Sequence, residues 1–528
     1  MRVEEILGQG RYDFSAKYMA SCRLNDMIHE NEADVTSRTI AIIESLYTNP
    51  EILAQSQAYF LFRELSRGLC AVAVRGRNDA PEHDALSALM SVLSNMRGSA
   101  HRAAAEALGA LPFRVQGPAI DLETPPEMPM TSLEGFLKEV GVAVHGPFQW
   151  MGRSLVAPVN GNGRLLVLKL GDAEASTGLY AEARWMAHLA EGGSDVTVPF
   201  DIPRSIRVQG SPVFRLQMTR DMLPDGPLPD RVRYAIGFMT HTNYFQYPNG
   251  ARPERRLKPE TFQEVMLRNA FLFGHLTARG IVHSAPIPLF HNRVQSLRRA
   301  DRGLYEWQRA GRLDRWLGSC RYPNFGVSGI RDFEHFISFD GWSRRLYPHV
   351  GTQLLSLLLV AGSYFRNLRP DLVGKDKTGE PVDARHLFDR EFLRELIAGL
   401  FDAYYHGFCG CRFKARLPVN LDCLAGRMVE EMGVDRHMEE VLRITDQSEM
   451  GDAEFHSFLE QRGFTKEAAE HTPKGVADIS LETGPHLGDF NQRISLPEMI
   501  EAVESMTSLC ILGRYCQVAG LDPAPFRA

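Results

Sequence analysis

Residues 164–170 have the sequence Arg164-Leu-Leu-Val-Leu-Lys-Leu, and a second informative run, Leu179-Tyr-Ala-Glu-Ala-Arg-Trp, follows them. The first run is apolar with a single lysine, Lys169, near its end, and it predicts a β-strand. The second run predicts a helix over residues 179–190 and carries Glu182, thirteen residues after the lysine. A lysine near a strand end is commonly just a solvent-facing charge. If a helix carboxylate holds the ammonium still, however, the pair is suited to positioning a phosphate.

The sequence on either side of this strand predicts more of a β-sheet. Residues 154–159 predict a strand that precedes it across the turn Asn160-Gly-Asn-Gly, which is a strong hairpin signal. A short helix is expected at residues 132–140. Residues 205–208 and 213–218 predict a second strand pair that closes across residues 209–212.

Beyond residue 260 the pattern becomes helical. Apolar residues recur at helical spacing over 261–278, 351–365, 386–406, 421–444 and 496–518. The first of these helices ends in Arg279-Gly-Ile-Val-His-Ser-Ala, and Asn292 lies nine residues beyond His283. Further on, an apolar run ends in Arg331-Asp-Phe-Glu, which offers carboxylate oxygens, the ligand type that Mg²⁺ takes while it contacts phosphates. The simpler alternative is that Asp332 and Glu334 cap a turn or pair with nearby arginines.

In order and local pattern, these three pieces resemble the protein-kinase-like superfamily over about 290 residues, and within it the atypical or pseudokinase branch, such as the SidJ-type glutamylases and selenoprotein O. The resemblance implies an α+β fold, a two-lobed protein-kinase-like domain with helical N-terminal and C-terminal extensions. It also implies that the chain binds ATP and Mg²⁺. Carried over residue by residue, Lys169, Glu182 and His283 would be catalytic. Lys169, Glu182, Asn292 and Asp332 would bind the cofactor, and Asn292 and Asp332 would hold the metal.

The chain departs from the kinase pattern at the catalytic loop. Ala285 stands where an acid is expected two residues after His283, and the spacing from His283 to Asn292 is two residues longer than usual. The loop expected to cover the phosphates, residues 145–152, lacks the usual glycine pattern. Kinase catalysis benefits from a carboxylate that takes the proton of the acceptor hydroxyl. Glu334, His283 and His291 are candidate substitutes that the sequence does not rank.

The loss at Ala285 orders the candidate functions. The expected function is an ATP-dependent transferase that modifies a protein, with adenylylation or amino-acid ligation favoured over phosphorylation. The alternative is a catalytically inactive, nucleotide-binding pseudokinase scaffold for protein partners. A small-molecule phosphotransferase of the antibiotic-kinase kind is a third possibility, which the missing loop acid disfavours.

Changes in residue composition and in hydrophobic periodicity along the chain predict its domains. They are a helical N-terminal region at 1–116, a linker at 117–131, a kinase-like N-lobe at 132–245, a C-lobe at 246–425 and a helical extension at 426–528. The C-lobe contains an arginine-rich insertion at 293–321. The insertion is either the solvated face of a helix or a lid or docking surface. The docking surface would take an acidic protein segment or a second nucleotide, because arginine forks bind carboxylates and phosphates. Nucleic acid is disfavoured, because few aromatic residues lie among the arginines.

Composition narrows the class and the compartment. The 528 residues are 44% hydrophobic and 23% charged, with a formal net charge of -6, which gives no global attraction to nucleic acid or to anionic membranes. The N-terminal residues lack the pattern of a secretion signal, so a cytoplasmic location without a membrane anchor is expected. Cys409 and Cys411 form the only close cysteine pair, and free thiols are expected there rather than a metal site.

Overall fold

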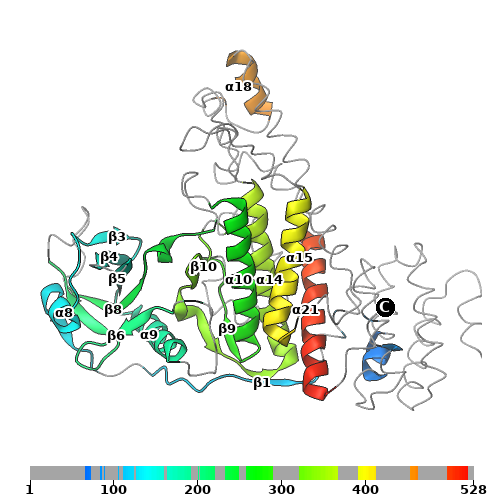
Figure 1. Cartoon of the computed structure of the whole chain (residues 1–528), viewed down its shortest axis with the longest axis horizontal. Helices are drawn as coiled ribbons and strands as arrows, with labels where there is room; N and C mark the ends of the chain where they lie inside the picture. The colour runs from blue at the N-terminus through cyan, green and yellow to red at the C-terminus, as the bar shows by residue number, and fades with distance from the viewer. Residues whose placement is uncertain are drawn as a thin grey trace, which may run out of the picture.

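The structure is a computed structural model in which a β-sheet and a group of helices lie next to each other, so the chain belongs to the mixed α+β class (Figure 1). The residues that it describes are 66–72, 84–85, 89, 105, 107, 111–123, 127–159, 163–191, 200, 202–219, 232–248, 257–288, 320, 322–366, 390–411, 452–461, 466 and 496–520.

The sheet has seven strands, and its long central pair is antiparallel. Strand β5 (Arg164–Gly171) pairs over its whole length with β8 (Val232–His241). The strand order is β2-β7-β8-β5-β4-β3, with β6 also on β8. The remaining strands are β2 (Met130–Ser132), β3 (Gln149–Met151), β4 (Ser154–Val159), β6 (Arg204–Ile206) and β7 (Phe214–Gln217). The predicted strands at 154–159 and 164–170 are confirmed as β4 and β5.

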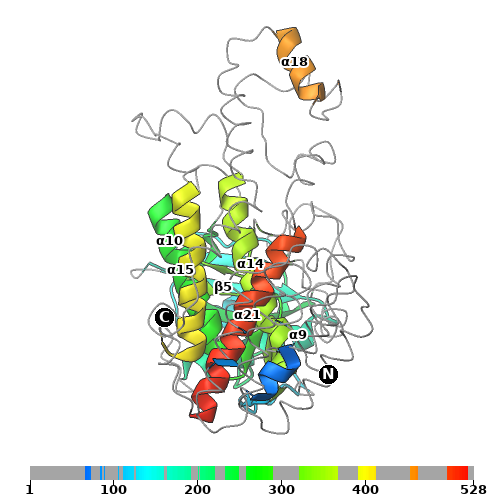
Figure 2. The ribbon, with the colours of Figure 1, turned by 90° about the vertical axis from the view of Figure 1, so that its right-hand side faces the viewer.

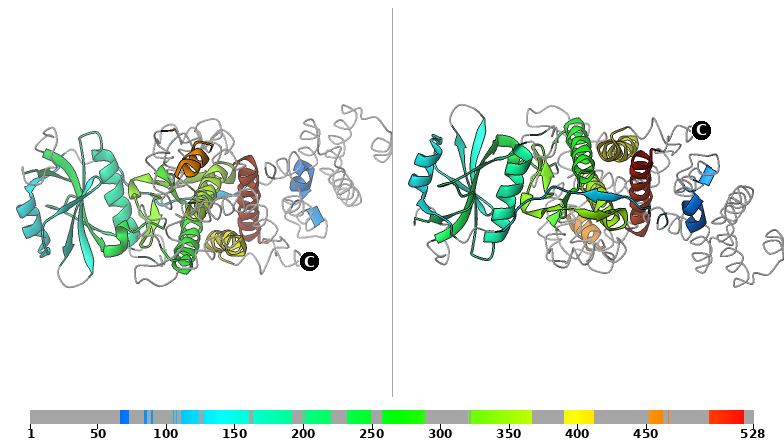
Figure 3. Two further views of the ribbon diagram at one scale, coloured as in Figure 1. Left: turned by 90° about the horizontal axis from the view of Figure 1, so that it is seen from above. Right: turned by 90° about the horizontal axis from the view of Figure 1, so that it is seen from below.

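The alternation of side chains along β5 assigns one helix to each face of the sheet. Leu166 and Leu168 point to the face that α8 (Leu133–Val140) covers with Phe136. Val167 points to the opposite face and belongs to the same apolar cluster as Trp185 of α9 (Ser176–Ala190). Successive strand residues alternate between faces, so Lys169 shares the α9 face with Val167. The two helices are seen on opposite sides of the sheet in Figure 3.

The predicted pairing of residues 205–208 with 213–218 is wrong. β6 and β7 both pair with β8, β6 at Phe238 and β7 at Ala235, so they lie end to end along one edge of that strand. Only the single bridge between Val208 and Ser211 closes the turn between them. Strand β8 was not predicted from the sequence. Its ten residues form an edge that is long enough to pair with both β6 and β7.

Four long helices form the other part of the molecule and lie side by side in two perpendicular views (Figures 1 and 2). They are α10 (Pro259–Thr277), α14 (Ser343–Arg366), α15 (Arg390–Cys409) and α21 (Leu496–Ala519). The helices predicted over 261–278, 351–365, 386–406 and 496–518 are thereby confirmed, although α14 begins eight residues earlier than predicted. The predicted helix at 421–444 lies outside the described residues.

Close packing between α10 and α15 depends on two glycines. A side chain at Gly274 would meet the carbonyl oxygen of Tyr404, and one at Gly407 would meet the carbonyl oxygen of Phe271. The two backbones therefore approach so closely that only glycine fits at these positions. Residues of α21 belong to the same apolar core as α14 and α15, so this part of the predicted C-terminal extension packs directly on the long helices.

The predicted linker at 117–131 runs from the helices to the sheet. Just before it, β1 (Arg114–Gln116) pairs with β13 (Asp340–Trp342), and at its end Met130 enters β2 at the sheet edge. Most of the predicted N-terminal region and the whole arginine-rich insertion except Cys320 lie outside the described residues. Within the described part of the chain, none of the helices combines the length and apolar character needed to cross a bilayer.

Candidate functional site

Two consecutive elements and a third that follows much later in the sequence bring their charged side chains together around Lys169. The Lys169 Nζ lies 2.6 Å from Glu182 Oε2 and 2.5 Å from Asp332 Oδ1. Lys169 lies on β5 and Glu182 on α9. Asp332 is the residue directly before the short 3₁₀ helix η5 (Phe333–His335). The lysine side chain is 10% exposed and that of Glu182 is 1% exposed, so the ion pair is almost fully removed from water.

A short pair of strands fixes the turn that carries Asp332, close to Lys169 of the sheet. Strand β12 (Phe336–Ser338) pairs antiparallel with β9 (Ile281–His283) and holds the turn that precedes it. At that turn Asp332 adopts a left-handed backbone conformation, with φ of 57°. This conformation is uncommon for a residue with a side chain, although aspartate tolerates it better than most.

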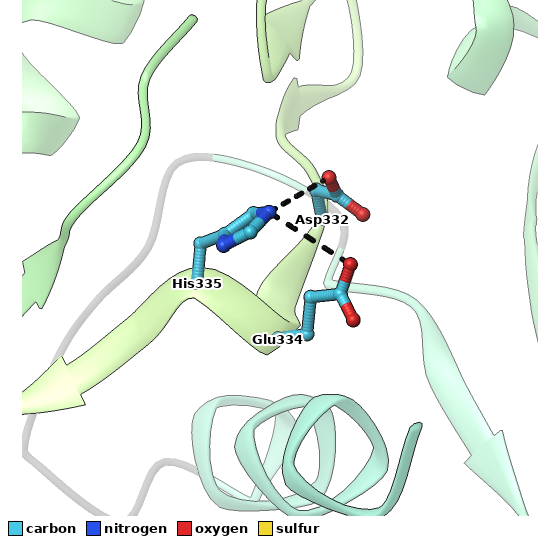
Figure 4. Close-up of side chains that lie close together, drawn as sticks. All are labelled: Asp332, Glu334 and His335. Carbon is cyan, nitrogen blue, oxygen red and sulfur yellow. Dashed lines mark ion pairs between the residues drawn. The ribbon is translucent and has the colours of Figure 1, made fainter. Parts of the chain in front are cut away.

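Asp332 belongs to a second group, with Glu334 and His335. The Nε2 atom of His335 lies 3.3 Å from Asp332 Oδ2 and 3.7 Å from Glu334 Oε1. Figure 4 shows the imidazole edge directed at both carboxylates. One ligand atom from each of the three residues lies within 4.8 Å of the others, which is a spacing that could hold a metal ion. The Lys169 Nζ is also 3.8 Å from Glu334 Oε1, so the two groups are continuous.

Burial and mutual charge shift the pKa values in this cluster in different directions. Burial is the largest influence on Glu182 and raises its pKa to about 7, against the opposing attraction of Lys169. Burial alone would lower the pKa of Lys169, but the negative charges of Glu182, Asp332 and Glu334 outweigh it and raise that pKa. Burial would also raise the pKa of Asp332, yet Lys169 and His335 together hold it well below its ordinary value.

Glu334 is held between the β3–β4 hairpin and the start of α9. Its Oε1 atom accepts a hydrogen bond from the Arg153 guanidinium at 3.2 Å. Its other carboxylate oxygen, Oε2, lies where a side chain at Gly178 would stand, at 2.7 Å from that position. Gly178 is in the first turn of α9, where the partial positive charge of a helix N-terminus favours a carboxylate. Burial is the largest single influence and would raise the pKa of Glu334, but Lys169, His335 and Arg153 together outweigh it and lower that pKa.

His283 has a role in positioning the backbone. Its Nε2 atom lies 3.0 Å from the carbonyl oxygen of Arg331, and its Nδ1 accepts a hydrogen bond from the Ala285 N–H at 3.3 Å. Both ring nitrogens are therefore engaged, with the proton on Nε2 in the neutral ring. The histidine is 1% exposed. This geometry favours a residue that ties the 281–285 segment to the turn before Asp332 over the predicted proton-transferring group.

The structure thus brings Lys169, Glu182 and Asp332 into one cluster. His283 instead contacts the backbone of Arg331 and Ala285. Asn292, the fourth predicted cofactor ligand, and His291 lie outside the described residues. His335 was not predicted from the sequence to be part of the site. Its signal was the spacing Asp332-Phe-Glu-His, which puts three metal-ligating side chains within four residues. Arg153 had no comparable signal, because its contact with Glu334 joins segments 181 residues apart.

Comparison with known proteins does not assign the chain to a family. No family model matches its sequence, and a search of curated proteins gave no significant match.

Proposed function

We propose that this chain is an ATP-dependent transferase with a two-lobed, kinase-like fold, which modifies a protein substrate by adenylylation or amino-acid ligation rather than by phosphorylation. The observation that carries the proposal is the contact of the Lys169 ammonium with both Glu182 and Asp332. A strand lysine held by a helix glutamate, with an aspartate in reach, is the set that kinase-like sites use to bind a nucleotide and its metal.

The residues fit this cofactor in charge and placement. Two of the three protons of the Lys169 ammonium are engaged by Glu182 and Asp332, which hold it in place and leave the third for a phosphate oxygen. The Asp332 carboxylate, with 17% of its side chain exposed, is the accessible oxygen ligand for Mg²⁺. When bound, the metal would neutralise phosphate charge, and Lys169 would orient the chain of phosphates. In this reading the seven-stranded sheet corresponds to the N-lobe and the long helices to the C-lobe.

The preference against phosphorylation rests on Ala285. This residue is fully buried, and its carbonyl oxygen accepts a hydrogen bond of 2.7 Å from the Asn324 side chain. The methyl group offers no proton acceptor to a substrate hydroxyl. In ATP-driven amino-acid ligation the group that first attacks ATP is a carboxylate, which is already ionised, so this step needs no acceptor base. In adenylylation a hydroxyl attacks the α-phosphate and pyrophosphate leaves, so the hydroxyl proton would have to go to a group other than residue 285.

The first experiment measures nucleotide binding. Calorimetry with ATP and Mg²⁺ should give saturable binding to the wild-type chain. Asp332→Ala should abolish the metal-dependent binding, and Lys169→Met should weaken it at least tenfold, because each removes a charged contact to the phosphates or their metal. Asp340→Asn, which alters an exposed ion pair with Arg114, is the control and should bind like the wild type. Unchanged ATP affinity in both site variants would remove the cluster from consideration as a nucleotide site.

The second experiment identifies the transferred group. The chain is incubated with cell lysate proteins and ATP labelled at the α- or the γ-phosphate, or with unlabelled ATP and radioactive glutamate. Protein labelled only from the α-phosphate indicates adenylylation, and labelled glutamate indicates ligation. Transfer from the γ-phosphate alone would contradict the proposed reaction class while leaving the nucleotide site intact.

A second candidate function is the inactive, nucleotide-binding scaffold. The buried alanine at position 285 and the full engagement of His283 favour it, because neither residue can transfer a proton in this arrangement. It predicts that ATP binds and that no label reaches protein in any arm of the experiment.

A further inference from the structure

We propose that Asp332, Glu334 and His335 together form one cation site that takes a divalent transition metal ion, with Mn²⁺ as the accessible example, in preference to Mg²⁺. This inference deepens the proposed function, on which it rests for the role of the cation beside the phosphates. It differs from that function in the ligands, because it adds an imidazole and a second carboxylate to Asp332.

The distances fit ligands of a single ion. Ligand atoms bound at about 2.1 Å to one octahedral ion lie about 3.0 Å apart when adjacent and about 4.2 Å apart when opposite. His335 Nε2 lies 3.3 Å from Asp332 Oδ2 and 3.7 Å from Glu334 Oε1. With all three ligand atoms within 4.8 Å of one another, the set needs only a small contraction (Figure 4).

The lysine leaves this site accessible to a cation. Lys169 Nζ contacts Asp332 through Oδ1, whereas His335 approaches the other oxygen, Oδ2. A cation between Oδ2, the imidazole and Glu334 therefore does not have to displace the ammonium from Asp332. Carboxylates commonly bridge two positive groups in this way, one on each oxygen.

The local charge balance favours an added cation. Three carboxylates, from Glu182, Asp332 and Glu334, surround the single ammonium of Lys169. The exposed Arg153 contacts Glu334, and the imidazole of His335, which binds a metal in its neutral form, lies beside Asp332 and Glu334. In addition, the Oε1 atom of Glu182 is fully buried and makes no hydrogen bond to any described residue. A cluster with excess buried negative charge and an unsatisfied carboxylate oxygen is stabilised when a divalent ion binds.

The imidazole decides which metal is preferred. Mg²⁺ binds oxygen ligands almost exclusively, whereas neutral imidazole is a good ligand for first-row transition ions. His335 is 5% exposed and sits beside two carboxylates, so its ring is held in place before the metal arrives. The competing explanation is a purely structural contact between His335 and the two acids, and that contact would show no metal preference.

The test measures metal uptake without nucleotide, so that it does not depend on the proposed transferase activity. Free Mn²⁺ is followed by electron paramagnetic resonance during titration of the full chain, and Mg²⁺ affinity is obtained by competition. The wild type should bind one Mn²⁺ per chain, more tightly than Mg²⁺. His335→Gln and Glu334→Gln should each weaken Mn²⁺ binding at least tenfold, and His335→Gln should change Mg²⁺ affinity much less.

His456→Ala is the matched control, because His456 lies on α18 (Asp452–Gln461), far from the sheet in both views of Figures 1 and 2. It should bind Mn²⁺ like the wild type, and circular dichroism melts should show that the site variants are folded. No Mn²⁺ uptake by the wild type, or equal Mn²⁺ affinity in the wild type and His335→Gln, would overturn the inference. ATP binding with Mg²⁺ could still be normal in that case, so failure of this site and failure of the proposed function are distinguishable.

Discussion

Replacing Glu182 by glutamine should make the protein more stable at pH 8 while weakening its nucleotide binding. Glu182 is 1% exposed, and burial raises its pKa from the ordinary 4.5 to about 7 despite the ammonium of Lys169. Up to about pH 7 the folded protein therefore favours the neutral carboxyl, and at pH 8 the buried carboxylate forms at a cost in free energy. Glutamine has nearly the same shape and is neutral at every pH.

The sign and size of the effect follow from proton linkage. Because the folded state holds the proton more tightly than the unfolded state, the contribution of Glu182 is fully present below pH 4.5 and is lost as the pH rises through about 7. The difference between 4.5 and about 7, at about 1.4 kcal/mol for each tenfold change in proton affinity, gives a loss of about 3 kcal/mol. Glu182→Gln does not undergo this loss.

Urea unfolding of both proteins at pH 5, 6, 7 and 8 measures the effect, with tryptophan fluorescence as the signal, since Trp185 is fully buried on α9 beside the site. The free energies of unfolding should differ by less than about 1 kcal/mol at pH 5 and by about 3 kcal/mol at pH 8, with the variant more stable. Groups far from Glu182 titrate alike in both proteins and cancel in the difference. As a control, Asp340→Asn should follow the wild type at each pH.

If the variant is less stable than the wild type at pH 8, the Glu182 carboxylate does not destabilise the folded protein and the prediction is wrong. That result would mean that Glu182 is ionised in the folded protein and that its attraction to Lys169 outweighs its desolvation. Weaker ATP binding by Glu182→Gln is expected in either case, because the glutamine no longer holds the ammonium by charge. A gain in stability with a loss in binding is typical of a residue kept for function.

Three further predictions concern positions where the structure sets the outcome. Gly178→Ala should displace the Glu334 carboxylate and weaken Mn²⁺ binding severalfold in the titration described above, with the melting temperature unchanged or raised, because alanine favours the helix by up to about 1 kcal/mol. Ala285→Asp should lower the free energy of unfolding by more than about 2 kcal/mol in urea titrations and should not produce γ-phosphate transfer, because the new carboxylate would be buried without a partner. Gly274→Ala should lower the same free energy by a similar amount, because the added methyl would meet the backbone of α15; wild-type stability in this variant would contradict the observed helix packing.

The sequence predicted elements well where one signal was strong and local. The apolar run before Lys169 and the long amphipathic helices needed only their own periodicity, and their bounds agree with the structure to within a few residues except at the start of α14. The strand β8 was missed, and with it the true partners of β6 and β7. Strand pairing is decided by contacts between distant segments, and a missing central strand leaves its neighbours with no partner except each other.

The same division applies to the site. Lys169, Glu182 and Asp332 were found because each stands in a recognisable local pattern, and the structure brings them into contact. The role of His283 could not be read from its pattern, because a histidine after a helix looks the same whether its ring faces a substrate or a backbone carbonyl. The spacing Asp332-Phe-Glu-His was a local signal for His335 that was not used, whereas Arg153 becomes significant only through its contact with Glu334, which no spacing in the sequence encodes.

The balance of charge separates this cluster from an ordinary structural ion pair. A structural pair in a protein interior neutralises itself, since an unbalanced buried charge costs several kcal/mol. Here one ammonium serves three carboxylates, and burial, with a smaller contribution from the charges of Asp332 and Glu334, raises the pKa of Glu182. The packed helices on one side and the sheet on the other supply the stability that tolerates it. Such an arrangement lowers its free energy when cations arrive from outside, and a metal-bound polyphosphate supplies them together with anions for Lys169. Under the proposed function, binding of a metal-bound nucleotide would therefore stabilise the cluster.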